Sequence, residues 1–337
     1  MKKIGIIANP TSGKDIRRLV SQALVVGNRE KVNIVKRVLI GAYAAGAREV
    51  MIMPDRYGIG NQSVHDLKNL FPQVISGVVI LDMPLDDSGL DSTLAAQSMR
   101  EWGADCIITL GGDGTVRVAA KGAGEIPLIP ISTGTNNVIP EFVEGTIAGL
   151  AAGYFSNIPE EKRKMRIERQ KKLDVWVNDK VVDTALVDIA VIADQHVGSR
   201  AVWDPEKLIE VAVTRAAPTN IGFTSIIGRY RTIESDAPYG AMAVLKDNGK
   251  CYQVQAAIGP GLIYDICVDD FQELLPNKLV PFTAQRPVVL ALDGEREIVL
   301  NEDDTAGIML RLDGPNFINI KKVMEMTRPK IESQKDL

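Results

Sequence analysis

Histidine, cysteine and aromatic residues are scarce in this sequence. Its 337 residues include only 2 histidines and 3 cysteines, and aromatic residues make up 5%. The cysteines are Cys106, Cys251 and Cys267, and their spacing is not that of metal ligands. Two histidines are too few for a histidine-based metal cluster. The sequence therefore disfavours a zinc module and predicts reduced thiols in a cytoplasmic protein.

The sequence also lacks an excess of positive charge and a long apolar run. With 39 basic and 43 acidic residues, its formal net charge is −4. Proteins that bind nucleic acids normally concentrate positive charge, so we expect small nucleotides rather than nucleic acid as partners. The first apolar run, Ile4–Ala8, is too short for a signal peptide or a membrane span. No membrane span is expected.

The first half of the chain alternates short apolar runs with segments of helical spacing. A chain of this length usually forms two domains, because a single core stops growing at roughly 250–300 residues. The expected strands are Ile4–Ala8, Val50–Met53, Ile75–Leu81, Cys106–Leu110 and Leu128–Ile131. Helical spacing occurs in Arg29–Ala45, Asn61–Leu70 and Ser92–Trp102. This α/β pattern predicts a doubly wound, Rossmann-like sheet that binds ligands at the carboxyl ends of its strands.

A mixed-charge run, Pro159–Lys172, marks the domain boundary as a linker or a solvated helix. We expect a Rossmann-like domain over residues 1–155, a mainly β substrate domain over 156–320 and a C-terminal tail over 321–337. A return of the tail to the first domain is one alternative. One helix is predicted in the second domain at Asp204–Arg215, where Asp204 can cap and Pro205 can occupy the first position. Its expected strands are Asp174–Val177, Val187–Ile192, Gln253–Ile258 and Val288–Leu292.

The segment Gly111-Gly112-Asp113-Gly114-Thr115 carries the strongest chemical signal, because it follows an apolar strand and precedes a helix. Glycines let a phosphate chain approach the backbone, and a helix N-terminus favours anions. A carboxylate at this place would repel phosphate unless it held a metal or accepted a proton. Asp113 is therefore a magnesium-linked group or a general base, and the structural alternative is a tight turn in which it caps the helix.

Two further loops follow strands at the same predicted sheet edge. They are Asn9-Pro10-Thr11-Ser12-Gly13, followed by Lys14, and Thr133-Gly134-Thr135-Asn136-Asn137. Their amides and hydroxyls can donate to phosphate and ribose oxygens, although each loop alone is more often a plain turn. Neither loop is a Walker A sequence, which disfavours a P-loop NTPase.

Together these loops resemble the superfamily that joins ATP-NAD kinases to diacylglycerol and sphingosine kinases. The whole chain resembles its ATP-NAD kinase-like family, the acetoin-catabolism protein X (AcoX) group. The resemblance implies a nucleotide in the cleft between the two domains, ATP or polyphosphate as phosphoryl donor, Mg²⁺, NAD as acceptor and a homo-oligomer. A lipid or other small alcohol as acceptor, and a catalytically inactive nucleotide-binding regulator, are the alternatives.

A second match lies at Leu292-Asp293-Gly294-Glu295, which resembles the Asp-Gly-Glu motif of the lipid kinases. The resemblance implies that Asp293 is an Mg²⁺ ligand and Glu295 a catalytic residue. A simple hairpin turn is an equally good interpretation of Asp-Gly between strands.

The positions implied to hold NAD depart from the family pattern. NAD kinases typically carry Asn-Glu early in the β domain, whereas this chain reads Leu186-Val187-Asp188. Val187 cannot make the hydrogen bonds of an amide, which leaves Asp188 as the candidate nucleotide-binding residue. The loop Gly222–Gly228 is the second such place. His196 could line the interdomain cleft, although a surface or satisfied loop histidine is the commoner interpretation. Phosphate could be contacted by Arg200, Arg215, Arg229 and Arg231, although arginines on such loops are usually solvated or paired.

Overall fold

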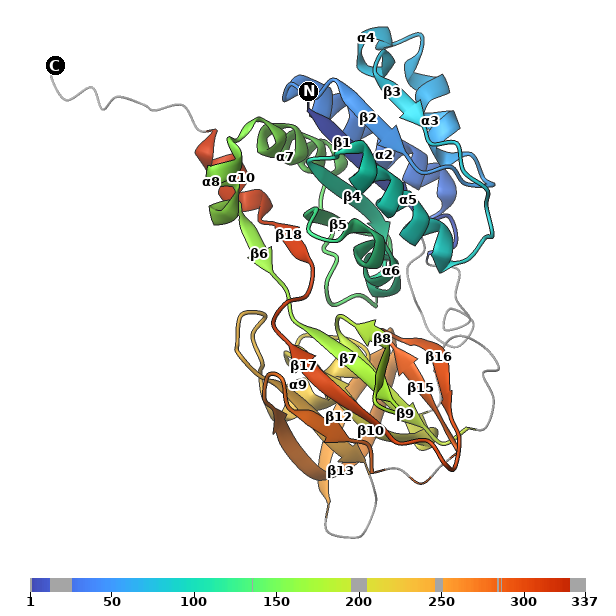
Figure 1. Cartoon of the computed structure of the whole chain (residues 1–337), viewed down its shortest axis with the longest axis vertical. Helices are drawn as coiled ribbons and strands as arrows, with labels where there is room; N and C mark the ends of the chain where they lie inside the picture. Colours follow the sequence, from blue (N-terminus) through green and yellow to red (C-terminus); the bar gives the residue numbers. More distant parts are fainter. Residues whose placement is uncertain are drawn as a thin grey trace, which may run out of the picture.

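Two domains, one above the other, make up the molecule, as Figure 1 shows. This computed structural model describes residues 2–12, 26–134, 136–194, 205–245, 251–283, 285 and 287–327. The expected fold class, a Rossmann-like domain followed by a mainly β domain, is confirmed. The predictions for Gly13, Lys14, Thr135, His196, Arg200 and Asp204 lie outside the described residues.

The first domain is built on a seven-stranded sheet with the order β3-β2-β1-β4-β5-β18-β6. All of its strand pairs are parallel except that of β18 with β6. The strands are β1 (Lys3–Ala8), β2 (Glu49–Ile52), β3 (Val78–Ile80), β4 (Cys106–Gly111), β5 (Leu128–Ser132), β6 (Ile167–Arg169) and β18 (Asn316–Ile318).

Helices cover both faces of this sheet, because each strand buries side chains on both sides. Along β1, Ile4, Ile6 and Ala8 enter one core cluster and Ile7 enters the other. The first face carries α2 (Asn28–Ala44), α3 (Ile59–Leu67), α4 (Pro72–Ile75), α7 (Gly145–Asn157) and α10 (Ile320–Met326). The second face carries α5 (Gly89–Trp102) and α6 (Asp113–Ala123). α8 (Glu160–Arg163) and the 3₁₀ helix η1 (Lys164–Arg166) connect α7 to β6.

The strand order reverses between β1 and β4, which creates a topological switch point. Ala8 at the end of β1 lies opposite Leu110 of β4, and Asn9 N donates to Leu110 O over 3.0 Å. The loops after these two strands therefore diverge from one place at the carboxyl edge of the sheet. Such crevices are where open α/β sheets bind ligands.

The second domain packs two antiparallel sheets face to face. The larger has the order β12-β13-β11-β10-β9-β15-β16 and the smaller β14-β17-β7-β8. Leu173 and Ile308 of the smaller sheet share one core cluster with Val191 of the larger. The outer face of the larger sheet is covered by α9 (Thr224–Tyr230). The strands are β7 (Lys172–Val177), β8 (Lys180–Ala185), β9 (Asp188–Ile192), β10 (Leu208–Val213), β11 (Gly240–Leu245), β12 (Tyr252–Gly259), β13 (Leu262–Leu274), β14 (Leu279–Pro281), β15 (Val288–Leu292), β16 (Glu295–Leu300) and β17 (Ala306–Arg311).

The helix predicted over Asp204–Arg215 is wrong. A 3₁₀ turn, η2 (Pro205–Lys207), is followed by strand β10, which pairs with β9 and β11. Val211 and Val213 enter one core cluster and Ala212 enters the other, so both faces of the segment are buried. Leu208, Val211 and Ala212 also have helical spacing, which explains the misassignment.

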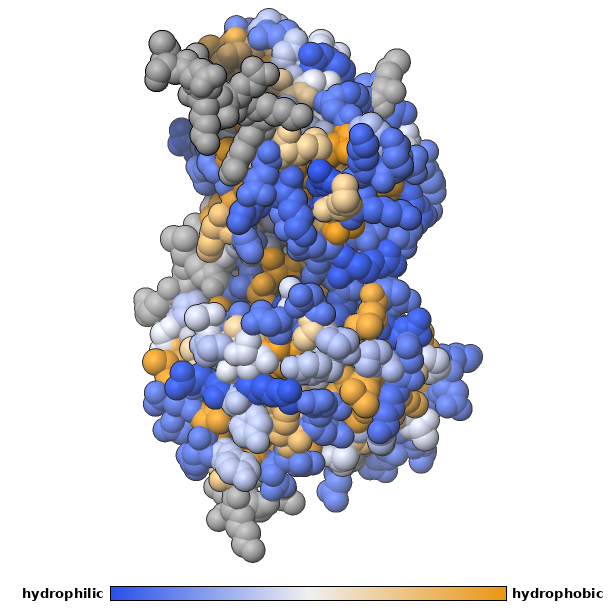
Figure 2. All heavy atoms as spheres, turned by 90° about the vertical axis from the view of Figure 1, so that its left-hand side faces the viewer, coloured by the Kyte–Doolittle hydropathy of each residue, from blue (hydrophilic) through white to orange (hydrophobic). Residues whose placement is uncertain are grey.

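The chain crosses between the domains twice. β6 and β18 lie in the first sheet, although both fall within the 156–320 range expected for the second domain. The charge run before β7 is only partly solvated, because Gln170 and Lys171 are buried. Figure 2 shows the molecule narrowing between the two domains, with a mostly hydrophilic surface on both. Within the described ranges, none of the helices has the length and apolar character that crossing a bilayer requires.

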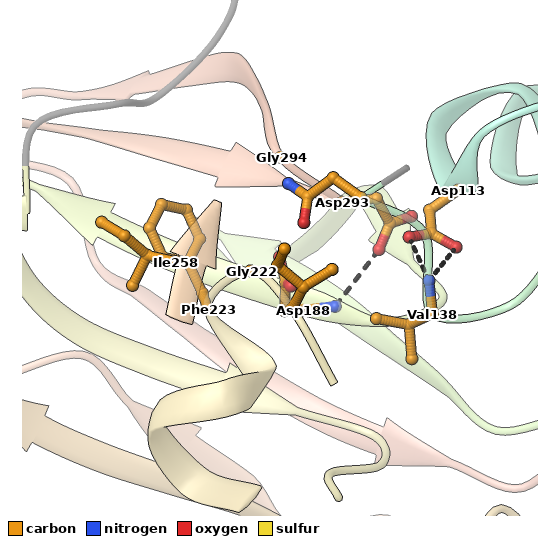
Figure 3. Close-up of a pocket in the computed structure, with 10 residues that line it drawn as sticks. Asp113, Val138, Asp188, Gly222, Phe223, Ile258, Asp293 and Gly294 are labelled. Carbon is orange, nitrogen blue, oxygen red and sulfur yellow. Dashed lines mark hydrogen bonds between the residues drawn. The ribbon is translucent and has the colours of Figure 1, made fainter. Parts of the chain in front are cut away.

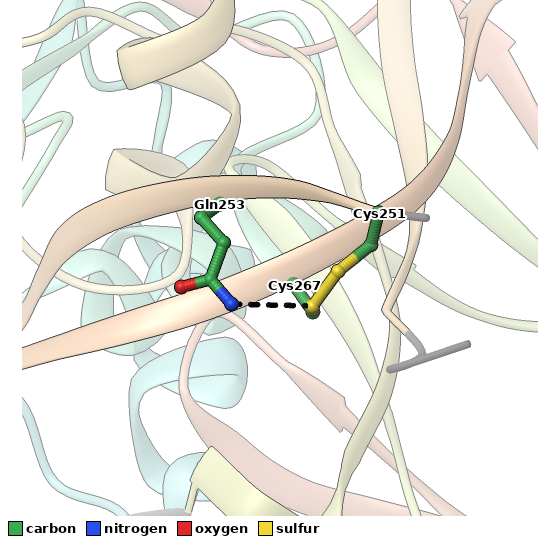
Figure 4. Close-up of a disulfide and its surroundings, with 3 residues drawn as sticks. All are labelled: Cys251, Gln253 and Cys267. Carbon is green, nitrogen blue, oxygen red and sulfur yellow. Dashed lines mark hydrogen bonds between the residues drawn. A yellow bond between two sulfur atoms is a disulfide. The ribbon is translucent and has the colours of Figure 1, made fainter. Parts of the chain in front are cut away.

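Two of the three cysteines are paired, contrary to the expectation of reduced thiols. Cys251, directly before β12, forms a disulfide with Cys267 of β13, with the two Cα atoms 5.3 Å apart (Figure 4). Antiparallel pairing of the two strands brings these residues together, which sequence spacing alone does not reveal. Cys106 is a buried free thiol in β4.

Candidate active site

Asp113 is the first residue of α6 and reaches across to the loop that follows β5. Its carboxylate accepts hydrogen bonds from Val138 N over 2.9 Å and from Ile139 N over 2.8 Å. The N-cap position of α6 is Gly112, so Asp113 is not the capping residue of the helix. Asp113 is 8% exposed. The glycine-rich loop is thus more than a turn, because its aspartate organises a second loop of the same sheet edge.

Asp293 lies in the tight turn between β15 and β16, where its φ is +50° and that of Gly294 is +82°. The hairpin interpretation is therefore right for the backbone, since such turns need positive φ at both central residues. The carboxylate is nevertheless buried in the domain interface. It accepts hydrogen bonds from Leu186 N, Val187 N and Asp188 N at 2.8–3.2 Å.

The carboxylates of Asp113 and Asp293 face each other between the domains (Figure 3). Burial, and then repulsion by Asp293, raise the pKa of Asp113 to about 7, although two backbone amides and Arg215 oppose the rise. Burial also raises the pKa of Asp293, against the opposing charge of Arg117. Both carboxylates are thus harder to ionise than a free aspartate, and a pKa near neutrality suits Asp113 to general base catalysis.

At two glycines of the Gly111–Thr115 loop, a side chain from another loop lies close to the backbone. A Cβ on Gly114 would lie 3.1 Å from Glu295 Oε1, so the Glu295 carboxylate rests on the start of α6. A Cβ on Gly112 would lie 2.7 Å from Asn137 Oδ1. Both contacts require glycine for space rather than for positive φ.

The three predicted phosphate loops are hydrogen-bonded to one another. Asn9 Nδ2 donates to Thr115 Oγ1 over 2.8 Å, and the hydroxyls of Ser12 and Thr133 are 2.8 Å apart. Asn9 Oδ1 accepts from Thr11 N over 2.9 Å. The residues that the structure brings together at this edge are Asn9, Pro10, Thr11, Ser12, Gly111, Gly112, Asp113, Gly114, Thr115, Thr133, Gly134, Asn136 and Asn137.

Lys31 of α2 binds the backbone of the first phosphate loop, a contact that the sequence did not predict. Its side chain is fully buried, and Nζ donates to Asn9 O over 2.7 Å and to Ser12 O over 2.9 Å. The available signal was a lysine next to Val32 in an otherwise apolar stripe of α2. Its charge orders the first loop and adds positive potential beneath it.

Two cavities border the loops. The first, a narrow pocket of about 20 Å³, lies between the domains. It is lined by Asp113, Asn136, Val138, Asp188, Ile221, Gly222, Phe223, Ile258, Asp293 and Gly294. The second, of about 400 Å³, lies on the first domain beside Asn9, Pro10, Thr11, Met53, Pro54, Asp55, Arg56, Tyr57, Asp87, Ser88, Asp91 and Ser92.

The departure at Leu186-Val187-Asp188 has a structural explanation. Leu186 and Val187 are each 1% exposed and belong to the same apolar cluster as Val116 and Ile139 of the first domain. Asp188 borders the interdomain cavity. The position where NAD kinases have an amide thus serves here to pack the domains together.

Arg215 is largely buried rather than solvated, and it is paired. Its guanidinium donates to Gln170 Oε1 over 2.6 Å, and its Nε has no hydrogen-bond partner among the described residues. Burial lowers the pKa of Arg215, and the negative charges of Asp113, Asp293 and Glu168 oppose this. Asn136 Oδ1 is likewise buried without a hydrogen-bond partner in the described parts of the chain. Asn136 borders the interdomain cavity and is suited to contact a ligand there.

Direct coordination of Mg²⁺ by Asp293 fits the geometry poorly. Its Oδ1 already accepts from three backbone amides, and its Oδ2 accepts from Leu186 N and lies 3.5 Å from Arg117 Nε. Within the described ranges no group of three or more histidine, cysteine or acidic side chains could hold a metal. Mg²⁺ commonly enters such sites with substrate phosphates instead.

Comparison with known proteins divides the chain as the fold does. Residues 4–157 match the family model for the ATP-NAD kinase N-terminal domain, and residues 171–313 match that for the acetoin catabolism protein X C-terminal domain. A curated relative from Cupriavidus necator, named acetoin catabolism protein X, is 35% identical over 319 residues. The alignment covers 91% of this chain and 87% of the relative.

Two similar solved structures are described as candidate diacylglycerol kinases from Bacillus anthracis strain Sterne. Each is 13% identical to this chain and covers 94% of it, with TM-scores of 0.43 and 0.42. The aligned regions include 97% and 98% of those chains.

Proposed function

Since the chain belongs to the acetoin catabolism protein X family and is a kinase-family protein, we propose that it transfers a phosphoryl group from ATP, or from polyphosphate, to a hydroxyl. One observation carries this proposal. The Asp113 carboxylate, whose pKa is raised to about 7, lies beside three joined loops of phosphate-binding character. A base with such a pKa is half ionised near neutral pH and can both accept and release a proton.

The donor would bind along the first domain. Backbone amides of Gly111–Thr115 and the N-terminus of α6 supply donors to phosphate, while Lys31 adds charge from below. The nucleoside would occupy the cavity beside Asn9 and Tyr57, whose exposed ring offers a stacking surface. Asn136 Oδ1 would accept a hydrogen bond from a ribose or acceptor hydroxyl.

Asp113 would act as the general base. The acceptor oxygen attacks the terminal phosphorus while the bond to the bridging oxygen breaks, and the hydroxyl proton moves to the Asp113 carboxylate. Glu295, which lies against Gly114, is the alternative base. Mg²⁺ would supply charge neutralisation on the donor phosphates, which are its usual ligands in phosphoryl transfer.

NAD is the leading acceptor because the first domain matches the ATP-NAD kinase model. Asp188 could accept hydrogen bonds from ribose hydroxyls at the interdomain cavity. We also propose that the enzyme is cytoplasmic and, as the resemblance to NAD kinases implies, homo-oligomeric.

A second acceptor class is favoured by the wall of the interdomain cavity. Its lining includes the apolar side chains of Ile221, Phe223 and Ile258. This wall suits an alcohol with an apolar body, either a small hydroxy compound or a lipid. Acetoin, which appears in the name of the Cupriavidus necator relative, is one small alcohol to test.

The test is to incubate the purified protein with ATP and Mg²⁺ and to measure NADP by enzymatic cycling and ADP release over an acceptor panel. The panel contains NAD, acetoin, glycerol and diacylglycerol vesicles, and polyphosphate replaces ATP in a parallel series. Asp113→Asn is the control variant, because it keeps the side-chain size and removes the charge.

NADP formed by the wild type and lost in Asp113→Asn would support NAD kinase activity. ADP release that depends on another acceptor would identify that alcohol, and not NAD, as the substrate. Nucleotide binding without turnover on any acceptor or donor would contradict a kinase and favour a regulator. Undiminished turnover by Asp113→Asn would remove Asp113 from the base role.

A further inference from the structure

Arg117 is a fully buried arginine of the first domain whose guanidinium contacts aspartates of the second domain. It lies on α6, four residues after Asp113, and therefore on the same side of the helix. Its side chain is 0% exposed. A buried guanidinium is unfavourable unless acidic groups pair with it, so the ion-pair partners of Arg117 indicate its role.

Two aspartates of the second domain form ion pairs with Arg117. Its guanidinium nitrogens are 3.3 Å from Asp183 Oδ2 on β8 and 3.5 Å from Asp293 Oδ2 in the β15–β16 turn. Asp293 is also 0% exposed and Asp183 is 13% exposed. One planar guanidinium can bridge two carboxylates in this way, whereas a lysine ammonium is a compact point charge.

The Asp293 carboxylate connects this bridge to the site. The carboxylate that Arg117 approaches also holds the amides of Leu186, Val187 and Asp188, and it faces Asp113. Without a cation, Asp293 would be a buried charge opposite a second carboxylate, which is strongly unfavourable. The contacts that secure Asp293 thus come from both domains.

We propose that Arg117 is a positioning residue that clasps the two domains and holds Asp293 opposite Asp113. The clasp forms only in the closed arrangement, because the cation and its two carboxylates come from different domains. Its part in phosphoryl transfer rests on the proposed function, whereas its part in domain closure does not.

Hydrogen exchange on the full chain without nucleotide tests the clasp directly. In Arg117→Met, we expect the amides of residues 186–188 to exchange about tenfold faster or more, since Asp293 loses its cation and the interface opens. The amides of β7 serve as the internal reference. Lys121→Met is the matched control, because Lys121 lies one turn farther along α6 and its Nζ is 2.6 Å from Asp183 Oδ1.

Kinetics give the second readout. We expect kcat of Arg117→Met to fall on the order of 100-fold, with KM for ATP nearly unchanged, because the phosphate loops lie in the first domain. For Arg117→Lys, both the exchange rate of residues 186–188 and kcat should lie between the values of wild type and Arg117→Met. An absence of phosphotransfer in the wild type would overturn the proposed function while leaving the exchange readout decisive for the clasp.

Equal behaviour of Arg117→Met and Lys121→Met in exchange would overturn the proposal. If Arg117→Met does not fold, the charge-balanced pair Arg117→Gln with Asp183→Asn replaces it, since one buried charge of each sign is removed. Faster exchange at residues 186–188 in that variant supports the clasp, and wild-type protection contradicts it.

Discussion

Replacement of Asp113 by asparagine should change how the stability of the protein depends on pH. The groups that face this carboxylate are Asp293, Arg215 and the amides of Val138 and Ile139. Burial and Asp293 raise its pKa to about 7, whereas an unfolded aspartate titrates near ~3.9. The folded state therefore binds an extra proton between these values.

The sign follows from proton linkage. Because the folded pKa is raised, Asp113 contributes stability that is fully present below the unfolded pKa and is lost as pH rises through about 7. Between the unfolded and the folded pKa, each pH unit changes the free energy of unfolding by ~1.4 kcal/mol. Between about pH 5 and about pH 8, wild type should lose roughly 2–3 kcal/mol relative to Asp113→Asn. Asparagine also weakens the bonds to Val138 and Ile139, but that cost does not depend on pH.

Urea denaturation in metal-free buffer, followed by tryptophan fluorescence, measures this difference at several pH values. The control is Asp179→Asn, which alters an exposed turn aspartate of the same charge. A free-energy difference between wild type and Asp113→Asn that stays constant from about pH 5 to about pH 8 would refute the raised pKa. The activity of Asp113→Asn is a separate measurement, and stabilisation with lost turnover is the expected combination.

Two further substitutions test the packing of the site. Gly112→Ala should weaken ATP binding about tenfold in calorimetry, because its Cβ would lie 2.7 Å from Asn137 Oδ1. Gly27→Ala, whose Cβ meets nothing within 4 Å, should bind normally, and equal affinities in both variants would contradict the argument. Val187→Asn, which restores the amide typical of NAD kinases, should destabilise the protein by ~1–3 kcal/mol in urea and give no gain in NADP formation. A stable variant with higher NADP formation would show that the apolar packing of Val187 is dispensable.

Much of the first domain could be predicted because buried parallel strands leave a direct pattern. Apolar runs such as Cys106–Leu110 became β4, and glycines after the strand identified the loop at the switch point. Apolar patterns that fit both the helical and the strand period did not decide between a helix and a strand. The segment that forms β10 satisfies both helical and strand spacing, and only its burial between two neighbouring strands decides between them.

The site itself depends on contacts between residues far apart in the sequence. The neighbours of Arg215 in the chain do not reveal its burial, and the apolar stripe beside Lys31 does not reveal its bonds to the first loop, because other elements supply those surroundings. The pairing of Cys251 with Cys267 likewise requires the register of β12 and β13. Sequence motifs could therefore name Asp113 and Asp293 separately, but not the repulsion between them.

The Asp-Gly motif of the second domain shows why its two interpretations are compatible. The tight β15–β16 turn requires positive φ at its first central residue, which aspartate tolerates better than most residues. That turn places the Asp293 carboxylate against the amides that connect β8 to β9 and within reach of Arg117. A glycine at position 293 would preserve the hairpin and lose every one of these contacts. The choice of aspartate at position 293 is therefore explained by the interface with the first domain and not by the turn.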